Sequence, residues 1–200
     1  MKKKHRISFF GSCLGKPGEP YYDAMEQAGE LIAQRGFIVV TGANSGLGME
    51  APAKGARNLG GHTIGYAIRG LGRVNEFIVE RYFCGWRWQS TSVKIGIRLG
   101  RLMDSDGFIM AIGKEGTFSE LAQFIDLSAK FRSHGRTKRL AILSLPEAPN
   151  PIDKDLLLYL QQKGLLSLKV LDAIRIYETP EDAVNWVTLG WASRNWSAQK

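Results

Sequence analysis

The sequence has few of the residues that mark disulfide-rich, metal-binding or membrane-spanning proteins. It contains 2 cysteines and 3 histidines among 200 residues, and Cys13 and Cys84 lie far apart in dissimilar surroundings. Neither a disulfide framework nor a zinc site is expected, and a reducing, cytoplasmic location fits. Apolar stretches such as Phe37 to Val40 are far shorter than the ~20 residues of a membrane helix. Ile7 to Phe10 is too short for the core of an export signal.

The chain is basic, but its cations are scattered. A formal net charge of +8 suits an anionic partner. The cationic runs, Lys2 to Lys4 and Arg136 to Arg139, are typical of solvated tails and turns rather than of a nucleic-acid-binding stripe. We therefore expect a small phosphorylated ligand as the partner, and neither nucleic acid nor a membrane.

Short β-branched or aromatic runs alternate with longer amphipathic runs, which is typical of repeated βαβ units. The predicted strands are 7–10, 37–41, 63–67, 77–82, 107–112, 140–143 and 174–177. The predicted helices are 22–34, 48–59, 92–103, 117–131 and a last one that opens at Thr179-Pro180 with an N-cap and an N1 proline. We predict a single domain over residues 1–200, an α/β fold with a doubly wound, mainly parallel sheet and helices on both faces.

Two glycine-rich loops each follow a predicted strand and open a predicted helix. They are Thr41 to Gly48 (TGANSGLG) and Gly113 to Glu120 (GKEGTFSE), and a third turn, Gly11 to Cys13, follows the first strand. Exposed backbone N–H groups at a helix N-terminus attract phosphate, and such loops meet at the carboxyl ends of parallel strands. The candidate phosphate-binding residues are Gly11, Ser12, Gly42, Asn44, Ser45, Gly46, Gly113, Lys114, Gly116 and Thr117.

Each loop also has a simpler interpretation that needs no ligand. The first can be an empty strand-to-helix turn. In the second, Thr117 and Glu120 are spaced as a capping box, in which each side chain accepts a backbone N–H of the other residue. Ser12 can cap a turn.

The first loop resembles the cofactor loop of short-chain dehydrogenases, and Tyr159 and Lys163 resemble their Tyr-x-x-x-Lys pair. That resemblance implies an NAD(P)-dependent dehydrogenase. A complete strand and helix precede the loop here, however, and the family's Asn-Asn-Ala-Gly motif is missing, so this is the least favoured hypothesis.

A larger part of the chain, from Ile7 to about Ser128, is similar to the LONELY GUY family. The matching parts occur in order and are Phe10-Gly11-Ser12, Thr41 to Gly48, Gly60 to Gly65, Asp106 to Ile109, and Gly113 to Glu120, which resembles the family's Gly-Gly-x-Gly-Thr-x-x-Glu motif. The resemblance implies a Rossmann-like fold, usually homodimeric, that binds a nucleoside 5′-monophosphate. It also implies hydrolysis of the N-glycosidic bond to free base and ribose 5-phosphate, with no required cofactor and no metal ligand set; whether magnesium assists is left open.

By the same resemblance, Glu120 is the catalytic carboxylate, which would stabilise positive charge on the ribose and orient water. The family's arginine position falls on Ile97 and its lysine position on Arg98, so Arg98 is the remaining candidate catalytic cation, or an ordinary exposed arginine. Lys114 replaces the second motif glycine. These departures also fit a non-catalytic binder, and relatives of this fold include a molybdenum-cofactor carrier. Hydrolysis is the leading hypothesis and binding without turnover the alternative.

An aromatic stretch precedes the helix that carries Arg98. Its Trp86 and Trp88 are expected to stack on a base, to line a dimer surface or to pack into the core.

Overall fold

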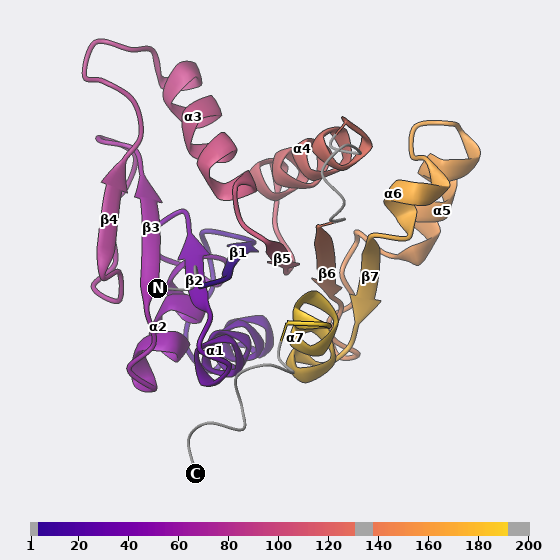
Figure 1. Ribbon diagram of the computed structural model, residues 1–200, viewed down its shortest axis with the longest axis horizontal. Helices are drawn as coiled ribbons and strands as arrows, with labels where there is room; N and C mark the ends of the chain where they lie inside the picture. The colour runs from indigo at the N-terminus through magenta and orange to yellow at the C-terminus, as the bar shows by residue number, and fades with distance from the viewer. Residues whose placement is uncertain (1–3, 131–137, 192–200) are drawn as a thin grey trace.

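The computed structural model describes residues 4–130 and 138–191, which form one seven-stranded parallel sheet (Figure 1). The strand order is β4-β3-β2-β1-β5-β6-β7. The strands are β1 (Arg6–Phe10), β2 (Ile38–Thr41), β3 (Thr63–Ala67), β4 (Glu80–Phe83), β5 (Gly107–Met110), β6 (Arg139–Leu143) and β7 (Ile174–Tyr177). The predicted Rossmann-like, doubly wound α/β fold is confirmed.

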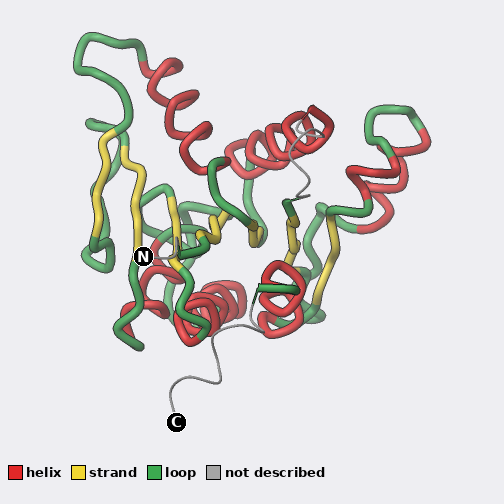
Figure 2. Tube along the Cα trace, in the orientation of Figure 1, coloured by secondary structure: helices red, strands yellow, loops and turns green. Residues whose placement is uncertain are grey.

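Helices cover both faces of the sheet (Figures 1 and 2). One face carries α1 (Pro20–Gln34), α2 (Glu50–Asn58) and α7 (Pro180–Thr188). The other carries α3 (Thr91–Met103), α4 (Glu115–Lys130), α5 (Lys154–Gln162) and α6 (Leu168–Leu171). Successive residues of a strand point to opposite faces, so Val39 joins the first core and Val40 the second.

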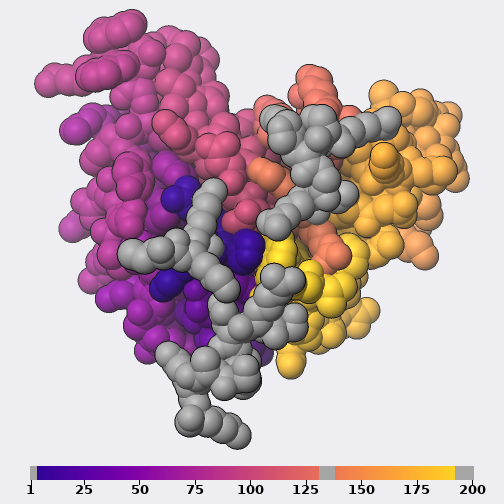
Figure 3. All heavy atoms as spheres, in the orientation of Figure 1, coloured from indigo at the N-terminus to yellow at the C-terminus, as the bar shows by residue number. Residues whose placement is uncertain are grey.

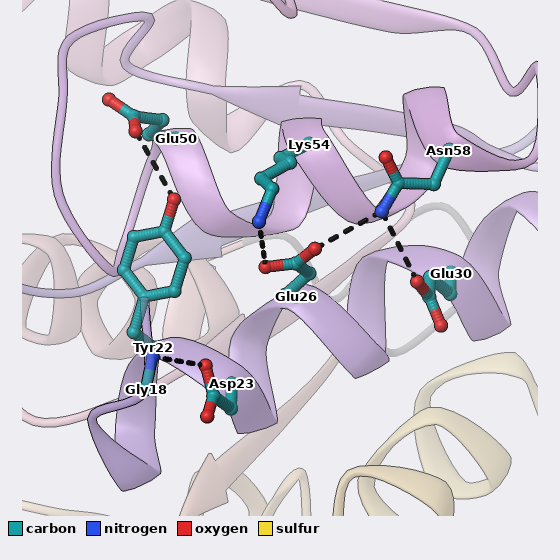
Figure 4. A network of polar contacts seen from close by, with 8 residues as sticks. All are labelled: Gly18, Tyr22, Asp23, Glu26, Glu30, Glu50, Lys54 and Asn58. Carbon is teal, nitrogen blue, oxygen red and sulfur yellow. Dashed lines mark hydrogen bonds and ion pairs between the residues drawn. The ribbon is translucent and has the colours of Figure 1, made fainter. Parts of the chain in front are cut away.

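Helices α1 and α2 pack at unusually close range (Figure 4). A Cβ on Gly55 would collide with the carbonyl oxygen of Glu26, so only glycine fits there. The Lys54 ammonium donates to the Glu26 carboxylate at 2.8 Å, and the Tyr22 hydroxyl donates to Glu50 at 3.2 Å. This packing fixes the start of α2 against α1, directly after the first glycine-rich loop.

The predicted start of the last helix is confirmed, whereas one strand is displaced. Helix α7 begins at Pro180, and the Thr179 hydroxyl accepts the N–H of Asp182 at 3.2 Å. The strand predicted over 77–82 is β4 at Glu80–Phe83. Its earlier apolar residues pack elsewhere, because Thr63 donates to the Phe77 carbonyl and Ile78 joins a small core beside the first loop.

Candidate functional site

The three predicted loops form one rim, as expected from the sequence. They follow β2, β1 and β5, which are neighbours in the sheet. The Ser12 N–H donates to the Ile112 carbonyl at 3.0 Å, and the Gly48 N–H donates to the Ser12 carbonyl at 3.0 Å. The direction of successive strand connections reverses between β1 and β5, which is where ligands of doubly wound folds bind.

Glycines join the first loop to the turn after β1. Gly46 has a φ of +99° and a Cβ there would collide with the backbone of Cys13. A Cβ on Gly11 would lie 2.9 Å from a Leu47 methyl carbon. Close packing of two loops therefore accounts for these glycines, while a contact of Gly46 with phosphate stays a prediction.

The first loop is braced by a residue that sequence reasoning missed. Asn75, buried and 31 residues beyond Asn44, donates its side-chain N–H groups to the carbonyls of Ala43 (3.0 Å) and Asn44 (2.8 Å). Asn44 in turn donates to the Leu71 carbonyl at 2.8 Å. No motif marks Asn75, because its partners are backbone atoms that only the fold brings near.

The start of α2 differs from the prediction. The helix begins at Glu50 rather than Gly48, and the N–H groups of Met49 and Glu50 both donate to the Gly46 carbonyl, at 3.2 and 2.8 Å. The loop folds back on the helix end and occupies these amides. The first loop therefore offers fewer free N–H groups to a phosphate than its sequence suggests.

The second loop keeps its helix amides free, and the capping-box interpretation is wrong. Helix α4 begins at Glu115, so Thr117 lies inside its first turn and cannot be the N-cap. Among the described residues, neither Thr117 nor Glu120 accepts a backbone N–H through its side chain, and the N–H groups of Glu115, Gly116 and Thr117 have no acceptor. Such an uncapped first turn is an anion-binding element.

Gly113 and Thr117 fit each other at the mouth of this loop. The Thr117 side chain occupies the space that a Cβ on Gly113 would need, and Thr117 is 3% exposed. Lys114 beside them is exposed. Ser12 caps its own turn, because its hydroxyl accepts the Leu14 N–H at 2.9 Å.

Arg98 faces the rim. A Cβ on Gly42 would lie 3.5 Å from its Nη1, so the guanidinium reaches the loop after β2. Arg98 also interacts electrostatically with Glu120 on α4 and with the buried Cys84. Ile97, at the family's arginine position, is 37% exposed and lines a groove that Glu120 does not line.

Glu120 is partly buried and has no hydrogen bond or ion pair with any described residue. Burial raises the pKa of its carboxyl to about 8, although the positive charge of Arg98 opposes this rise. The carboxyl is therefore mostly neutral at pH 7 and adds little negative charge to α4.

The structure does not bring Tyr159 and Lys163 to this rim. Tyr159 lies on α5, and Lys163 directly follows that helix (Figure 1). In the sheet, β1, β5 and β6 separate β2, the strand before the first loop, from β7. Tyr159 is 53% exposed and only Lys163 lies over its ring, at 5.6 Å. Within residues 4–130 and 138–191, no group of three or more His, Cys, Asp or Glu residues could hold a metal ion.

Comparisons with known proteins agree with this class of fold. Residues 4–80 match the family described as LDcluster4, the SLOG cluster4 family. A protein of Archaeoglobus fulgidus, described only as uncharacterized, is 28% identical over 178 residues, which cover 86% of this chain and 88% of that protein. None of the described helices is long and apolar enough to cross a membrane.

Solved structures share the fold over nearly the whole chain. The molybdenum cofactor binding protein of Rippkaea orientalis is 24% identical with a TM-score of 0.64, over 94% of this chain and 98% of that one. The Moco carrier protein of Chlamydomonas reinhardtii is 19% identical with a TM-score of 0.64, over 94% and 97%. DNA processing protein A of Helicobacter pylori, whose structure concerns single-stranded DNA binding, is 16% identical with a TM-score of 0.59, over 91% and 79%. At these identities the likeness shows the fold alone.

Proposed function

We propose that this chain is a binding or carrier protein for a small phosphorylated ligand, a nucleoside monophosphate or the molybdenum cofactor. The observations that carry the proposal are the uncapped first turn of α4 at the rim, where three N–H groups are free, and Arg98, which reaches Gly42 and interacts with Glu120 on the same helix. Structures of the same fold that bind or carry the molybdenum cofactor support the choice of ligand class.

The charge state of Glu120 supports binding over turnover. A neutral carboxyl does not repel a phosphate, whereas stabilising a cationic ribose requires a carboxylate. With a pKa of about 8, the neutral form predominates at pH 7. Ile97 also leaves the rim without the second cation of the hydrolases, in agreement with a ligand that is held and not cleaved.

The test is calorimetric titration of the protein with AMP and with isolated molybdenum cofactor. We expect Arg98→Met to weaken binding at least tenfold, because it removes the cation that reaches the rim at Gly42. Lys169→Met, an exposed charge change on α6, is the control and should leave affinity unchanged. Unaltered affinity in Arg98→Met would contradict the proposed site.

The pH dependence gives a second test of the same site. Above pH 8 the Glu120 carboxylate forms and should repel the phosphate, so wild-type affinity should fall between pH 7 and 9. Glu120→Gln cannot ionise and should bind equally at both pH values. A parallel fall in both proteins would remove Glu120 from the binding site.

Hydrolysis of the N-glycosidic bond remains the second candidate function, and the unpaired Glu120 carboxyl beside Arg98 favours it. In that reaction water adds to the anomeric carbon, the base leaves with a proton, and ribose 5-phosphate is formed. Chromatography of mixtures with nucleoside 5′-monophosphates tests it. Base release that rises above pH 8 and disappears in Glu120→Gln would establish the hydrolase; its absence from the wild type would exclude turnover of these substrates.

We also propose that the protein forms a homodimer through α3. Val93, Gly96, Ile97 and Gly100 follow one another at helical spacing and are all exposed. This flat apolar stripe suits a second copy of the same helix. Light scattering should give twice the chain mass, and Val93→Glu should reduce it to that of one chain; Lys169→Glu should not.

A further inference from the structure

A second concave site lies between the outer strands of the sheet and α3. It is a groove of about 950 Å³ bounded by β3, β4, the loop after β4 and α3, and Ile97 of the proposed dimer stripe lies at its border. None of the rim residues Gly42, Thr117 and Glu120 lines it. In Figure 3 the α3 segment and the loop before it project at the upper left of the molecule.

The groove is strongly cationic. Four arginines line it, and no carboxylate does; they are Arg6, Arg69, Arg87 and Arg101. None of the four forms an ion pair within 4.0 Å with a carboxylate of the described residues. Unpaired guanidinium groups that converge on one concavity repel one another, so an anion that enters it is favoured.

The nearest acid on β4 is already engaged. Glu80 accepts from the Tyr82 hydroxyl at 2.7 Å and lies 2.7 Å from the His62 ring nitrogen. Both interactions hold the pKa of Glu80 below its usual value, the Tyr82 bond having the larger effect. They also fix the ring of Tyr82, which is one wall of the groove.

Aromatic rings form a further part of the wall. Tyr66, Tyr82, Phe83 and Trp86 line the groove, and the last three are 49%, 41% and 70% exposed. Trp86 lies in an ordered turn. Its backbone N–H donates to Gln89 Oε1 at 2.8 Å, and its backbone carbonyl accepts the Gln89 N–H at 3.1 Å. The Arg69 guanidinium already lies over the Phe83 ring at 4.3 Å, so Trp86 is the most open ring of the groove. Such a ring can stack on the base of a nucleotide while guanidinium groups hold the phosphate of that nucleotide.

We infer that this groove is a second ligand site, which binds a nucleotide. Arg101 and its neighbouring arginines hold the phosphate, and Trp86 stacks on the base. The ligand is a free nucleotide or one unit of a single strand, since both present the same chemistry. The site is separate from the rim, and the inference stands whether or not the rim binds a phosphorylated ligand.

The experiment follows the tryptophan indole N–H signals of the ¹⁵N-labelled protein by NMR. Trp88 provides a matched control, because it lies two residues from Trp86, is 81% exposed and does not line the groove. The two signals are assigned with Trp86→Phe and Trp88→Phe. AMP should shift the Trp86 signal and not that of Trp88, and adenosine or inorganic phosphate at the same concentration should shift it several-fold less.

Charge variants test whether the groove or the overall charge binds the ligand. Arg101→Ser should raise the Kd for AMP at Trp86 at least fivefold, whereas Arg81→Ser, an exposed arginine of β4 outside the groove, should change it less than twofold. Thr117→Val, at the rim, should leave the Trp86 titration unchanged. Equal weakening by Arg101→Ser and Arg81→Ser would overturn the inference.

Repeating the titration with a single-stranded thymidine oligonucleotide of ten nucleotides distinguishes a free nucleotide from a single strand as the ligand. A shift of Trp86 with AMP at a Kd equal to or lower than that of the oligonucleotide indicates a mononucleotide site. A shift at a Kd at least tenfold lower with the oligonucleotide indicates a single-strand site. Absence of a Trp86 shift with both ligands would overturn the inference.

Discussion

Glu120 is a partly buried acid, and its raised pKa makes the free energy of unfolding depend on pH. The pKa of the carboxyl is about 4.5 in the unfolded chain and about 8 in the fold. Between these values the folded protein holds a proton that the unfolded chain has lost. Its contribution therefore favours folding fully below pH 4.5 and is lost as the pH rises towards 8.

We predict that Glu120→Gln flattens the dependence of stability on pH. Wild-type stability should fall relative to the variant by up to about 1.4 kcal/mol for each pH unit between pH 5 and 8. Chemical denaturation at several pH values measures this difference. Parallel curves for both proteins would show that Glu120 ionises normally.

Asn75 is the residue on which the shape of the first loop depends most. Asn75→Ala removes the side-chain donors to the carbonyls of Ala43 and Asn44, although the Ala43 carbonyl keeps the Asn75 backbone N–H, and should cost about 1–3 kcal/mol of stability. Asn58→Ala, which removes two surface hydrogen bonds on α2, should change stability by less than about 0.5 kcal/mol. Similar losses in the two variants would contradict the bracing role of Asn75.

At the scale of elements, the contact between α1 and α2 is the most sensitive to side-chain size. Gly55→Ala places a methyl group against the Glu26 carbonyl and should destabilise the protein by about 2 kcal/mol or more. Gly100→Ala on α3 has open space around it and should stabilise the monomer by about 0.4–1 kcal/mol. Urea denaturation at low protein concentration compares them; a harmless Gly55→Ala would mean that the helices can move apart.

The elements that the sequence predicted well are those with strong local signals. The two strands Thr63–Ala67 and Ile174–Tyr177 and the start of α7 have the predicted bounds. The capping box predicted at Thr117 was wrong. Helix α4 begins at Glu115, two residues before Thr117, and its first backbone N–H groups are left without a cap. Trp86 and Trp88 are exposed and not in the core, which leaves a ligand or a dimer surface as their open alternatives.

At the scale of the molecule, the sequence predicted where the rim lies but not which side chains from distant segments contact it. Alternation of strands and helices implied that loops 41–48 and 113–120 lie at the same edge of the sheet, and in the structure they flank the turn after β1. The direction of Arg98, the bracing by Asn75 and the arginine groove depend on how distant segments pack. No spacing along the chain encodes those contacts.

A whole-molecule prediction follows from the position of the rim between β1 and β5. A ligand bound there restrains both strands, so saturating AMP should slow amide hydrogen exchange in Arg6–Phe10 and Gly107–Met110. β7, at the sheet edge, serves as the internal control. Equal protection of β7 would indicate general stabilisation instead of binding at the rim.

The central place of β1 also governs the order of assembly. β1 is made first, yet one of its neighbours is β5, and Ser8 donates to the carbonyl of Leu102 across 94 residues of sequence. At a synthesis rate of about 5–20 residues per second, the nascent β1 waits roughly 5–20 s for that neighbour. During this interval the edge of β1 that will face β5 has unpaired backbone N–H and C=O groups, with which other chains can pair. A ribosome-associated chaperone that covers this edge would therefore raise the yield of folded protein without contacting the mature fold.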